Sequence, residues 1–253
     1  VALTMSMWDG SVEMPVVEGR AGCFGPNEGL AISQAKALAD RLKIPHFVIP
    51  VAKEFSEYVL EYFRREYRSG RTPNPCVRCN QTIKFGAMLE GARKAGVEFD
   101  YFATGHYAQI CDKGVDTPIL WRSQDPLKDQ SYFLSRLSRE TLSKVLFPLG
   151  EMKKEDVKAL AEKIGWVDLA HKKESQDFLE CGDYSVLFNE SDNTPGNFVD
   201  VSGKVLGRHR GIVHYTIGQR KGLNIGGQPE PLFVLGIDAN RNEVILGKRS
   251  VLS

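Results

Sequence analysis

The sequence predicts an α/β protein in which a largely parallel sheet, covered by helices on both faces, is followed by a smaller β-rich region. Short apolar runs alternate with helical patterns through the first part of the chain. From Thr194 on, Gly and Pro instead punctuate short β-like runs. The 253 residues exceed a usual domain of about 100 to 200 residues, which agrees with a second, smaller unit.

The first elements predict a β-α-β series. Val1–Met5 and His46–Val51 are apolar runs typical of buried strands. Between them, apolar residues recur at helical spacing and stop before Pro45. These residues are Leu30, Ala31, Ala35, Leu38, Ala39 and Leu42.

Two more helices and a strand are expected next. Glu54–Ser69 has apolar residues at helical spacing and ends at Gly70, a residue that tolerates positive φ. Asn80–Ala95 is the following helix, and Phe99–Thr104 is a strand. Ligands gather at the carboxyl ends of parallel strands, so Thr104–His106 is expected at a binding site.

The remaining pattern is helical and then β-like. Ser138–Phe147 and Lys154–Ile164 are predicted helices. Leu232–Ile237 and Val244–Gly247 are predicted to form a hairpin. The change from helical patterns to short β-like runs predicts a domain boundary near residue 190.

Composition excludes several classes of protein. With 33 Lys+Arg against 32 Asp+Glu, an RNA substrate would need a local basic patch rather than bulk charge. No apolar run approaches the roughly 18 residues of a membrane span, and no targeting peptide opens the chain. Five cysteines, an odd number without a secretory signal, indicate a cytosolic protein with thiols rather than a disulfide scaffold.

The strongest chemical signal is Gly70–Asn80, where Cys76 and Cys79 form a C-x-x-C pair in a loop that contains two prolines. We expect the pair just before a helix, whose N-terminus favours the thiolate that attacks sulfur, carries persulfide or binds metal. The spacing also fits half of a zinc site. Such a site needs two more ligands, and the sequence has no second C-x-x-C and no H-x-x-x-H.

Five motifs together resemble those of the tRNA-specific 2-thiouridylases, in that family's order. They are Arg71–Phe85, Thr104–Tyr107, Lys128–Leu134, Glu174–Asp177 and Tyr215–Leu223. The resemblance implies an adenine-nucleotide α-hydrolase-like fold, also called a HUP or PP-loop fold. It implies a catalytic nucleotide-binding domain over 1–190, a central β-rich tRNA-binding domain over 191–229, and the start of a C-terminal β-barrel over 230–253.

The same resemblance implies ATP-dependent thiolation, with ATP and Mg²⁺ as cosubstrate. The C2 oxygen of the wobble uridine is adenylated, pyrophosphate leaves, sulfur attacks C2, and AMP departs. The order is chemically sensible because a carbonyl oxygen is a poor leaving group until it becomes a phosphate ester. The implied partners are tRNA, through its anticodon loop, and a sulfur-donor protein or sulfide, in the cytoplasm.

Individual positions match the family's functional residues. Cys79 matches the catalytic cysteine. The residues that match contacts to the target base are Asn74, Pro75 and Cys76, and those that match nucleotide contacts are Met5 and Gly105. The residues that match tRNA contacts are His106, Lys128, Asp129 and Gln130. Taken alone, Gly105 is typical of a turn, His106 of a polar residue that holds a loop, and Lys128–Gln130 of a turn with an exposed lysine.

Three cysteines leave the route of sulfur open. Cys76 stands where many members carry Asp, and a second thiolate permits a disulfide or shared metal ligation. Cys181 is the natural third thiol, although many members place this cysteine two residues earlier, where the chain has Leu179. In one reading Cys181 carries a persulfide and then forms a disulfide with Cys79. In another, Cys76, Cys79 and Cys181 hold a [4Fe–4S] cluster; a structural zinc, or no metal, is the third.

For two groups of residues the default expectation is that they take no direct part in the chemistry. The densest basic cluster comprises Arg64, Arg65, Arg68, Arg71 and Arg78. A solvated helix face is the default interpretation, and guidance of the anticodon stem is the alternative. Cys23 and Cys111 match no motif and are expected to be inert.

The family's Ser-Gly-Gly-Val-Asp-Ser loop, which cradles pyrophosphate, does not occur in the sequence. We expect it upstream of Val1 and most of the barrel beyond Ser253, and we expect no adenylation by the chain as it stands. Two other functions remain open: a non-catalytic RNA- or metal-binding module, and another ATP-pyrophosphatase such as an amidating ligase. The cysteine pair argues against the ligase, which needs no sulfur relay.

Overall fold

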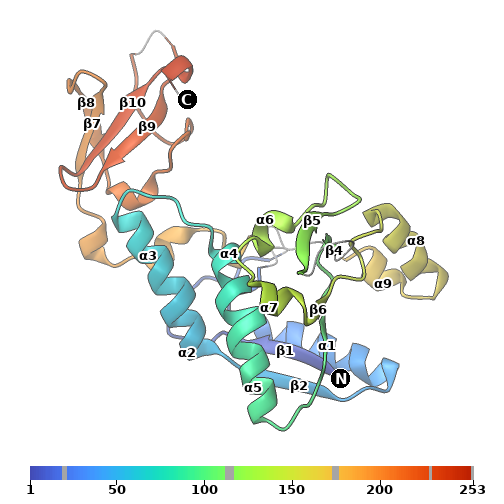
Figure 1. The fold of residues 1–253 in the computed structure, drawn as a ribbon. Helices are drawn as coiled ribbons and strands as arrows, with labels where there is room; N and C mark the ends of the chain where they lie inside the picture. The colour runs from blue at the N-terminus through green and yellow to red at the C-terminus, as the bar shows by residue number, and fades with distance from the viewer. Residues whose placement is uncertain (19–21, 112–116, 173–176, 228–229, 252–253) are drawn as a thin grey trace. The chain divides into compact units, whose positions relative to one another are not determined.

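The computed structural model describes residues 1–18, 22–111, 117–172, 177–227 and 230–251, which form two compact units (Figure 1). The first unit comprises Val1–Ser11, Pro15–Tyr58 and Pro75–Gly182. The second comprises Val12–Met14, Val59–Asn74 and the chain from Asp183 onward. The segment Val59–Asn74 therefore packs with residues far along the sequence.

The predicted β-α-β series is confirmed in the first unit. The strands β1 (Ala2–Ser6) and β2 (His46–Pro50) pair in parallel, and α1 (Glu28–Leu42) connects them. The start of α1 is tied to the end of β1, because the Glu28 carboxylate accepts hydrogen bonds from the backbone N–H groups of Met7 and Trp8, at 2.5 and 2.9 Å.

The expected parallel sheet is formed only in part. The strands β3 (Phe102–Ala103) and β6 (Val145–Leu146) make a second parallel pair, and β4 (Ala108–Cys111) pairs antiparallel with β5 (Ile119–Arg122). Among the described residues these pairs are separate two-stranded sheets, because no ladder of hydrogen bonds joins β1 to β3. A cavity lies between β1 and β3 instead.

The prediction of one helix over Ser138–Phe147 was wrong. The helix α7 (Arg139–Leu142) begins where the Ser138 hydroxyl accepts a hydrogen bond from Thr141 N, and the chain then enters β6. Val145 is buried in a core cluster and its strand pairs with β3, so packing and strand pairing override the helical pattern.

The helix expected at Asn80 begins five residues earlier in the chain, at Pro75. Three segments follow one another without a break: α4 (Pro75–Cys79), the π-helix η2 (Asn80–Ala87) and α5 (Met88–Lys94). Gly96 has a φ of 81° and follows the helix as predicted. The two cysteines therefore lie inside a helix rather than in a loop before it.

Shorter helices complete the first unit: α2 (Ala52–Phe55), α6 (Ser131–Leu134), α8 (Lys154–Lys163) and α9 (Val167–Ala170). A π-helical segment, η1 (Ser56–Leu60), follows α2. No helix among the described residues has both the length and the apolar character that crossing a membrane requires.

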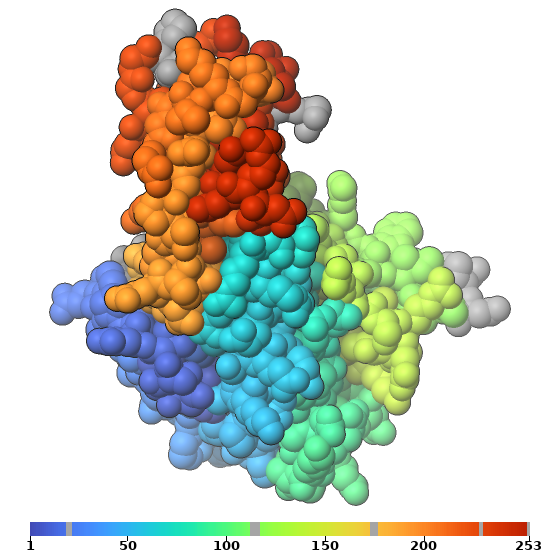
Figure 2. All heavy atoms as spheres, turned by 90° about the vertical axis from the view of Figure 1, so that its left-hand side faces the viewer, coloured from blue at the N-terminus to red at the C-terminus, as the bar shows by residue number. Residues whose placement is uncertain are grey.

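The second unit is built on a four-stranded sheet in the order β8-β7-β10-β9. Its strands are β7 (Gly196–Asp200), β8 (Val205–His209), β9 (Phe233–Asp238) and β10 (Glu243–Gly247). The predicted hairpin is confirmed as β9 and β10. The orange and red atoms of these strands gather into one continuous body (Figure 2). Its 3₁₀ helices are η3 (Tyr184–Leu187), η4 (Glu190–Asp192), η5 (Ile212–His214) and η6 (Arg249–Val251).

The helix α3 (Glu61–Arg68) belongs to the second unit. Phe63 is buried, and its ring lies 5.3 Å from that of Tyr184 and 6.3 Å from that of Phe188, centroid to centroid. Burial of one aromatic ring against two others fixes the helix on the segment that leads into the sheet.

Candidate functional site

The thiols of Cys76 and Cys79 lie on α4, both half-buried. Burial raises the pKa of Cys79 to about 11; the charge of Lys84 opposes this effect and a Cys76 thiolate adds to it. Burial also raises the pKa of Cys76, again opposed by Lys84, with the Asp177 carboxylate adding to the rise. The helix N-terminus was expected to favour the thiolates, but removal from water outweighs it here.

A third thiol, Cys23, joins this group although its sequence context gave no signal. The residue as a whole is exposed, but its thiol is surrounded by protein atoms. Burial raises its pKa, and the charges of Cys79 and Cys76 raise it further while Lys84 lowers it. These mutual effects mean that the three sulfur atoms share one electrostatic environment.

A clasp, defined as residues 22–27 together with 177–181, holds Cys23 in place. Phe24 and Leu179 form a parallel bridge, and the backbone N–H groups of Cys23 and Phe24 donate to Phe178 O at 3.1 and 2.9 Å. The backbones approach so closely that a Cβ at Gly22 would lie 2.5 Å from the nitrogen of Glu180.

Cys181 lies at the end of the clasp and is buried, with 7 % of its surface exposed. None of the five cysteines, all of which are described, is in a disulfide. Within the described residues, no three His, Cys, Asp or Glu side chains are arranged to hold a metal ion. A cluster held by Cys76, Cys79 and Cys181 therefore does not fit this arrangement. Of the motif at 174–177, residues 174–176 lie outside the described residues.

A cavity of about 800 Å³ lies beside the thiol helix. Its walls come from β1, from the segment around β3 and from the helix, and its lining includes Met5, Gly105, His106, Lys84 and Gln130. The volume is in the usual range of small-molecule sites. The structure thus brings together the two residues expected at the nucleotide and two of those expected at tRNA.

Gly105 is not explained by backbone strain. Its φ is outside the left-handed region, and a Cβ there would meet only Leu149 Cδ1, at an ordinary 3.7 Å. A Cβ at this position would therefore be accommodated by the protein, and Gly105 lines the cavity.

His106 is buried in the cavity wall. Its Nδ1 lies 2.7 Å from the Thr104 hydroxyl, and its ring lies 5.9 Å from those of both Phe85 and Phe147. Burial lowers its pKa to about 3, and the charge of Lys84 adds to the effect. The imidazole is therefore neutral near pH 7, and its contacts match a residue that holds the loop.

The turn at Lys128–Gln130 supports the loop that carries His106. Gln130 N donates to Tyr107 O at 2.8 Å, and Tyr107 N donates to Gln130 Oε1 at 2.9 Å. Although burial opposes ionisation of Asp129, hydrogen bonds from Ser123 and Ser131 lower its pKa. These contacts account for Asp129 and Gln130 as turn residues, and Lys128 is half-buried.

Asn74 and Pro75 are half-buried and adjacent, at the point where the chain leaves the second unit and enters the first.

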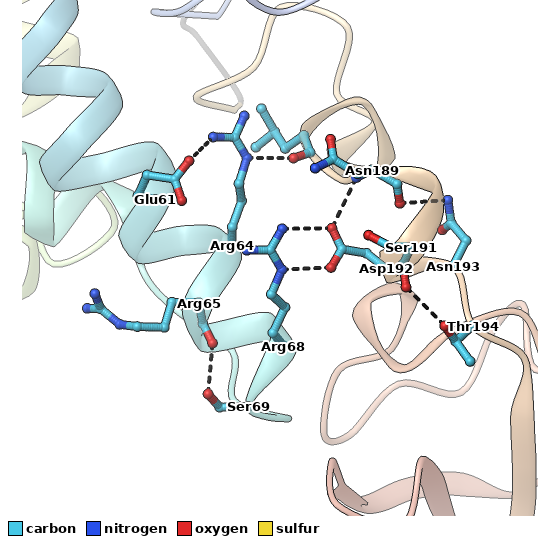
Figure 3. Close-up of polar contacts among 11 residues, drawn as sticks. Glu61, Arg64, Arg65, Arg68, Ser69, Asn189, Ser191, Asp192, Asn193 and Thr194 are labelled. Carbon is cyan, nitrogen blue, oxygen red and sulfur yellow. Dashed lines mark hydrogen bonds and ion pairs between the residues drawn. The ribbon is translucent and has the colours of Figure 1, made fainter.

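Clustered arginines have partners inside the second unit, and those of Arg64 and Arg68 are drawn in Figure 3. Arg64 Nε donates to Leu187 O at 2.6 Å, Arg68 forms an ion pair with Asp192, and Arg71 forms one with Glu66. In the first unit, Arg78 Nε donates to Tyr58 O at 3.1 Å. These contacts give most of the cluster a structural role, and Arg64, with 18% of its side chain exposed, is less solvated than the default interpretation expected.

Lys84 is the residue that the sequence reasoning missed. It lines the cavity with Met5 and Gly105, and its charge acts on Cys23, Cys76, Cys79 and His106. It lies inside the Arg71–Phe85 motif, but no spacing rule singled it out.

The chain matches two family models and many curated relatives. Residues 1–181 match the model described as "tRNA methyl transferase HUP domain", and residues 185–248 match "tRNA methyl transferase PRC-barrel domain". The chain is 47% identical over 251 residues to the tRNA-specific 2-thiouridylase MnmA of Endomicrobium trichonymphae, which covers 98% of the chain and 69% of the relative.

Two further relatives carry the same name. The protein of Magnetococcus marinus is 43% identical over 257 residues, covering 100% of the chain and 69% of the relative. That of Geotalea uraniireducens is 48% identical over 260 residues, covering 100% and 67%. The family models are named for methyl transfer and these relatives for thiolation.

Proposed function

The chain belongs to the tRNA-specific 2-thiouridylase family, and from that premise we propose that it replaces the C2 oxygen of the wobble uridine in tRNA with sulfur, using ATP. It is a transferase that modifies tRNA. The observation that carries the proposal is that one continuous helix bears both thiols, those of Cys76 and Cys79, and also contributes Lys84 to the wall of the cavity.

The chemistry separates activation from substitution. The uridine O2 attacks the α-phosphorus of ATP, supplied with Mg²⁺, and pyrophosphate leaves with the electron pair of the broken P–O bond. Sulfur then attacks C2, the C2–O bond breaks, and AMP departs with the former carbonyl oxygen. The cavity, with Met5 and Gly105 in its lining, is assigned to the adenine nucleotide.

We assign the Cys79 thiol as the reactive one. The neighbouring residues Asn74, Pro75 and Cys76 are assigned to contact with the target base. His106, together with Lys128, Asp129 and Gln130, is assigned to the tRNA side. The hydrogen bonds of Asp129 and Gln130 support an indirect part for these two residues, in which they fix the loop that carries Gly105 and His106.

For sulfur, we propose a persulfide relay rather than the cluster, because the described cysteines do not form a metal-holding group. The terminal sulfur of a Cys181 persulfide attacks C2. The Cys79 thiolate then attacks the Cys181 sulfur, a Cys79–Cys181 disulfide forms, and the sulfur left on C2 keeps the electron pair. An external thiol supplies the two electrons that restore both cysteines.

This relay needs partners and a movement. Because Cys181 is buried, a sulfur-donor protein reaches it only after the clasp opens. Sulfide that attacks C2 directly is the alternative supply. We place the reaction in the cytoplasm, where thiols stay reduced. We also propose a domain boundary near residue 190, between 1–190 and the chain that follows, which the two family models support in outline. Separate domains over 191–229 and 230–253 do not fit the structure, because β7 and β10 pair in one sheet across that limit.

The experiment is nucleoside mass spectrometry of tRNA from a strain that lacks the protein. We expect 2-thiouridine to be lost, to return with the wild-type gene, and not to return with Cys79→Ser. Unchanged 2-thiouridine in the deleted strain would overturn the proposal. Loss of a methylated nucleoside instead would favour the chemistry in the family model's name, and loss of neither would favour a binding module or an amidating ligase.

A further inference from the structure

Lys84 lies where the thiol helix meets the cavity. It is half-buried, and it lines the cavity together with Met5, Gly105 and His106. It is also five residues after Cys79 along the continuous helix formed by α4 and η2. One ammonium group is therefore shared by the expected nucleotide site and the reactive thiol.

The π-helical geometry of η2 makes this sharing possible. In an α-helix, the side chain of residue i+5 points about 140° around the helix axis from the side chain of residue i. In a π-helix, whose turn is wider, the side chain of residue i+5 lies within about 50° of the side chain of residue i. Because η2 begins at Asn80, directly after Cys79, Lys84 returns to the face that carries the thiols.

The charge of Lys84 is not neutralised by a carboxylate in the described part of the chain. No ion pair of Lys84 occurs among the described residues, whereas Lys94 on the same helix pairs with Glu90 at 2.7 Å. Its influence reaches both sides: it lowers the pKa of Cys79 and that of His106. A half-buried cation in a cavity favours an anionic ligand.

We propose that Lys84 binds the phosphoryl group of the adenine nucleotide at the end of the cavity next to Cys79. The inference rests on the proposed function for the identity of the nucleotide. It adds a residue that holds the AMP moiety beside the thiol, so that the activated C2 and the sulfur meet. The ammonium also neutralises the charge that accumulates on AMP as it leaves.

The test uses the protein at its natural length and AMP as the probe. The His106 imidazole, recorded by NMR, reports arrival of AMP because His106 shares the cavity with Lys84. We expect Lys84→Gln to weaken AMP binding about 10- to 100-fold, because one charge-assisted contact to phosphate is lost. Lys84→Arg should restore most of the affinity, and Lys94→Gln, the matched control on the same helix, should change nothing.

A second readout separates this inference from a folding defect and from the proposed function. In Lys84→Gln without AMP, the pKa of His106 should rise from about 3, since a nearby positive charge is gone. In an unfolded variant the pKa of His106 would instead be the ordinary value of about 6.5. Equal AMP affinity in wild type, Lys84→Gln and Lys94→Gln overturns the inference, as does a wild type that does not bind AMP. The proposed function fails separately, on 2-thiouridine.

Discussion

Arg68 and Asp192 form a two-point ion pair, with Nε to Oδ1 at 2.6 Å and Nη2 to Oδ2 at 2.8 Å. The pair joins α3 to η4 inside the second unit, and Asn189 N donates to the same carboxylate at 3.0 Å. Residues far apart in the sequence are thus fixed in one unit by planar, charge-assisted contacts.

Asp192→Asn should destabilise the second unit. Arg68 is 41% exposed, so solvent screens the pair, and we expect a loss of about 1–2 kcal/mol in the free energy of unfolding, measured in urea. Glu66→Gln breaks the more exposed pair with Arg71 and is the matched control, with a loss below about 1 kcal/mol. Equal losses of unfolding free energy in the two variants would contradict the conclusion that the Arg68–Asp192 pair stabilises the second unit more than the Arg71–Glu66 pair does.

The same pair predicts a pH dependence. The hydrogen bond from Arg68 lowers the pKa of Asp192 below its ordinary value. Its contribution to stability is therefore present above about pH 4 and is lost as the pH falls through the lowered pKa. Urea titrations between neutral and acid pH should show a steeper fall for wild type than for Asp192→Asn. Parallel curves would exclude a contribution from this carboxylate.

Cys79 should react slowly at neutral pH. Because its pKa is about 11, the thiolate fraction and the rate of iodoacetamide alkylation should rise about tenfold per pH unit up to that value. Peptide mass spectrometry gives the rate for Cys79 alone, and the urea-unfolded chain is the control, with a midpoint near about 8.5. A native midpoint at or below that of the unfolded chain would show that burial does not dominate.

The clasp should control access to Cys181. Gly22→Ala places a methyl group against the backbone of Glu180, at 2.5 Å, so we expect the clasp to open and alkylation of Cys181 to accelerate. Gly29→Ala is the control, because nothing lies within 4 Å of its Cβ position and it is helical; about 0.5–1 kcal/mol of stabilisation is expected. If both variants leave Cys181 equally protected, the clasp does not gate this thiol.

Anaerobic purification tests the route of sulfur. Because Cys76, Cys79 and Cys181 do not form a metal-holding group among the described residues, we expect a colourless protein without stoichiometric iron or acid-labile sulfide. Cys181→Ser should then abolish thiolation that depends on a persulfide donor, but not thiolation supported by sulfide. Iron and sulfide in cluster proportion, lost in Cys76→Ser, would restore the cluster interpretation.

Much of the local structure could be predicted from sequence. The strand–helix–strand start, the stop at Gly96 and the final hairpin follow from apolar periodicity and from glycines. Ser138–Phe147 could not be predicted correctly, because a two-residue strand at Val145 is stabilised by its partner β3 and not by its own pattern. The π-helical turn after Cys79 also has no sequence signature.

By itself, the sequence determined the family, the C-x-x-C pair and the alternation of strands and helices, because motif order and periodicity are local properties of the chain. Tertiary structure alone decided which groups share an electrostatic environment. It set Cys23 near the α4 thiols, buried Cys181 at the end of the clasp, and placed Lys84 in the wall of the cavity, where its charge also acts on the thiols. Burial and Coulomb interactions depend on distance in space, which separation along the chain does not specify.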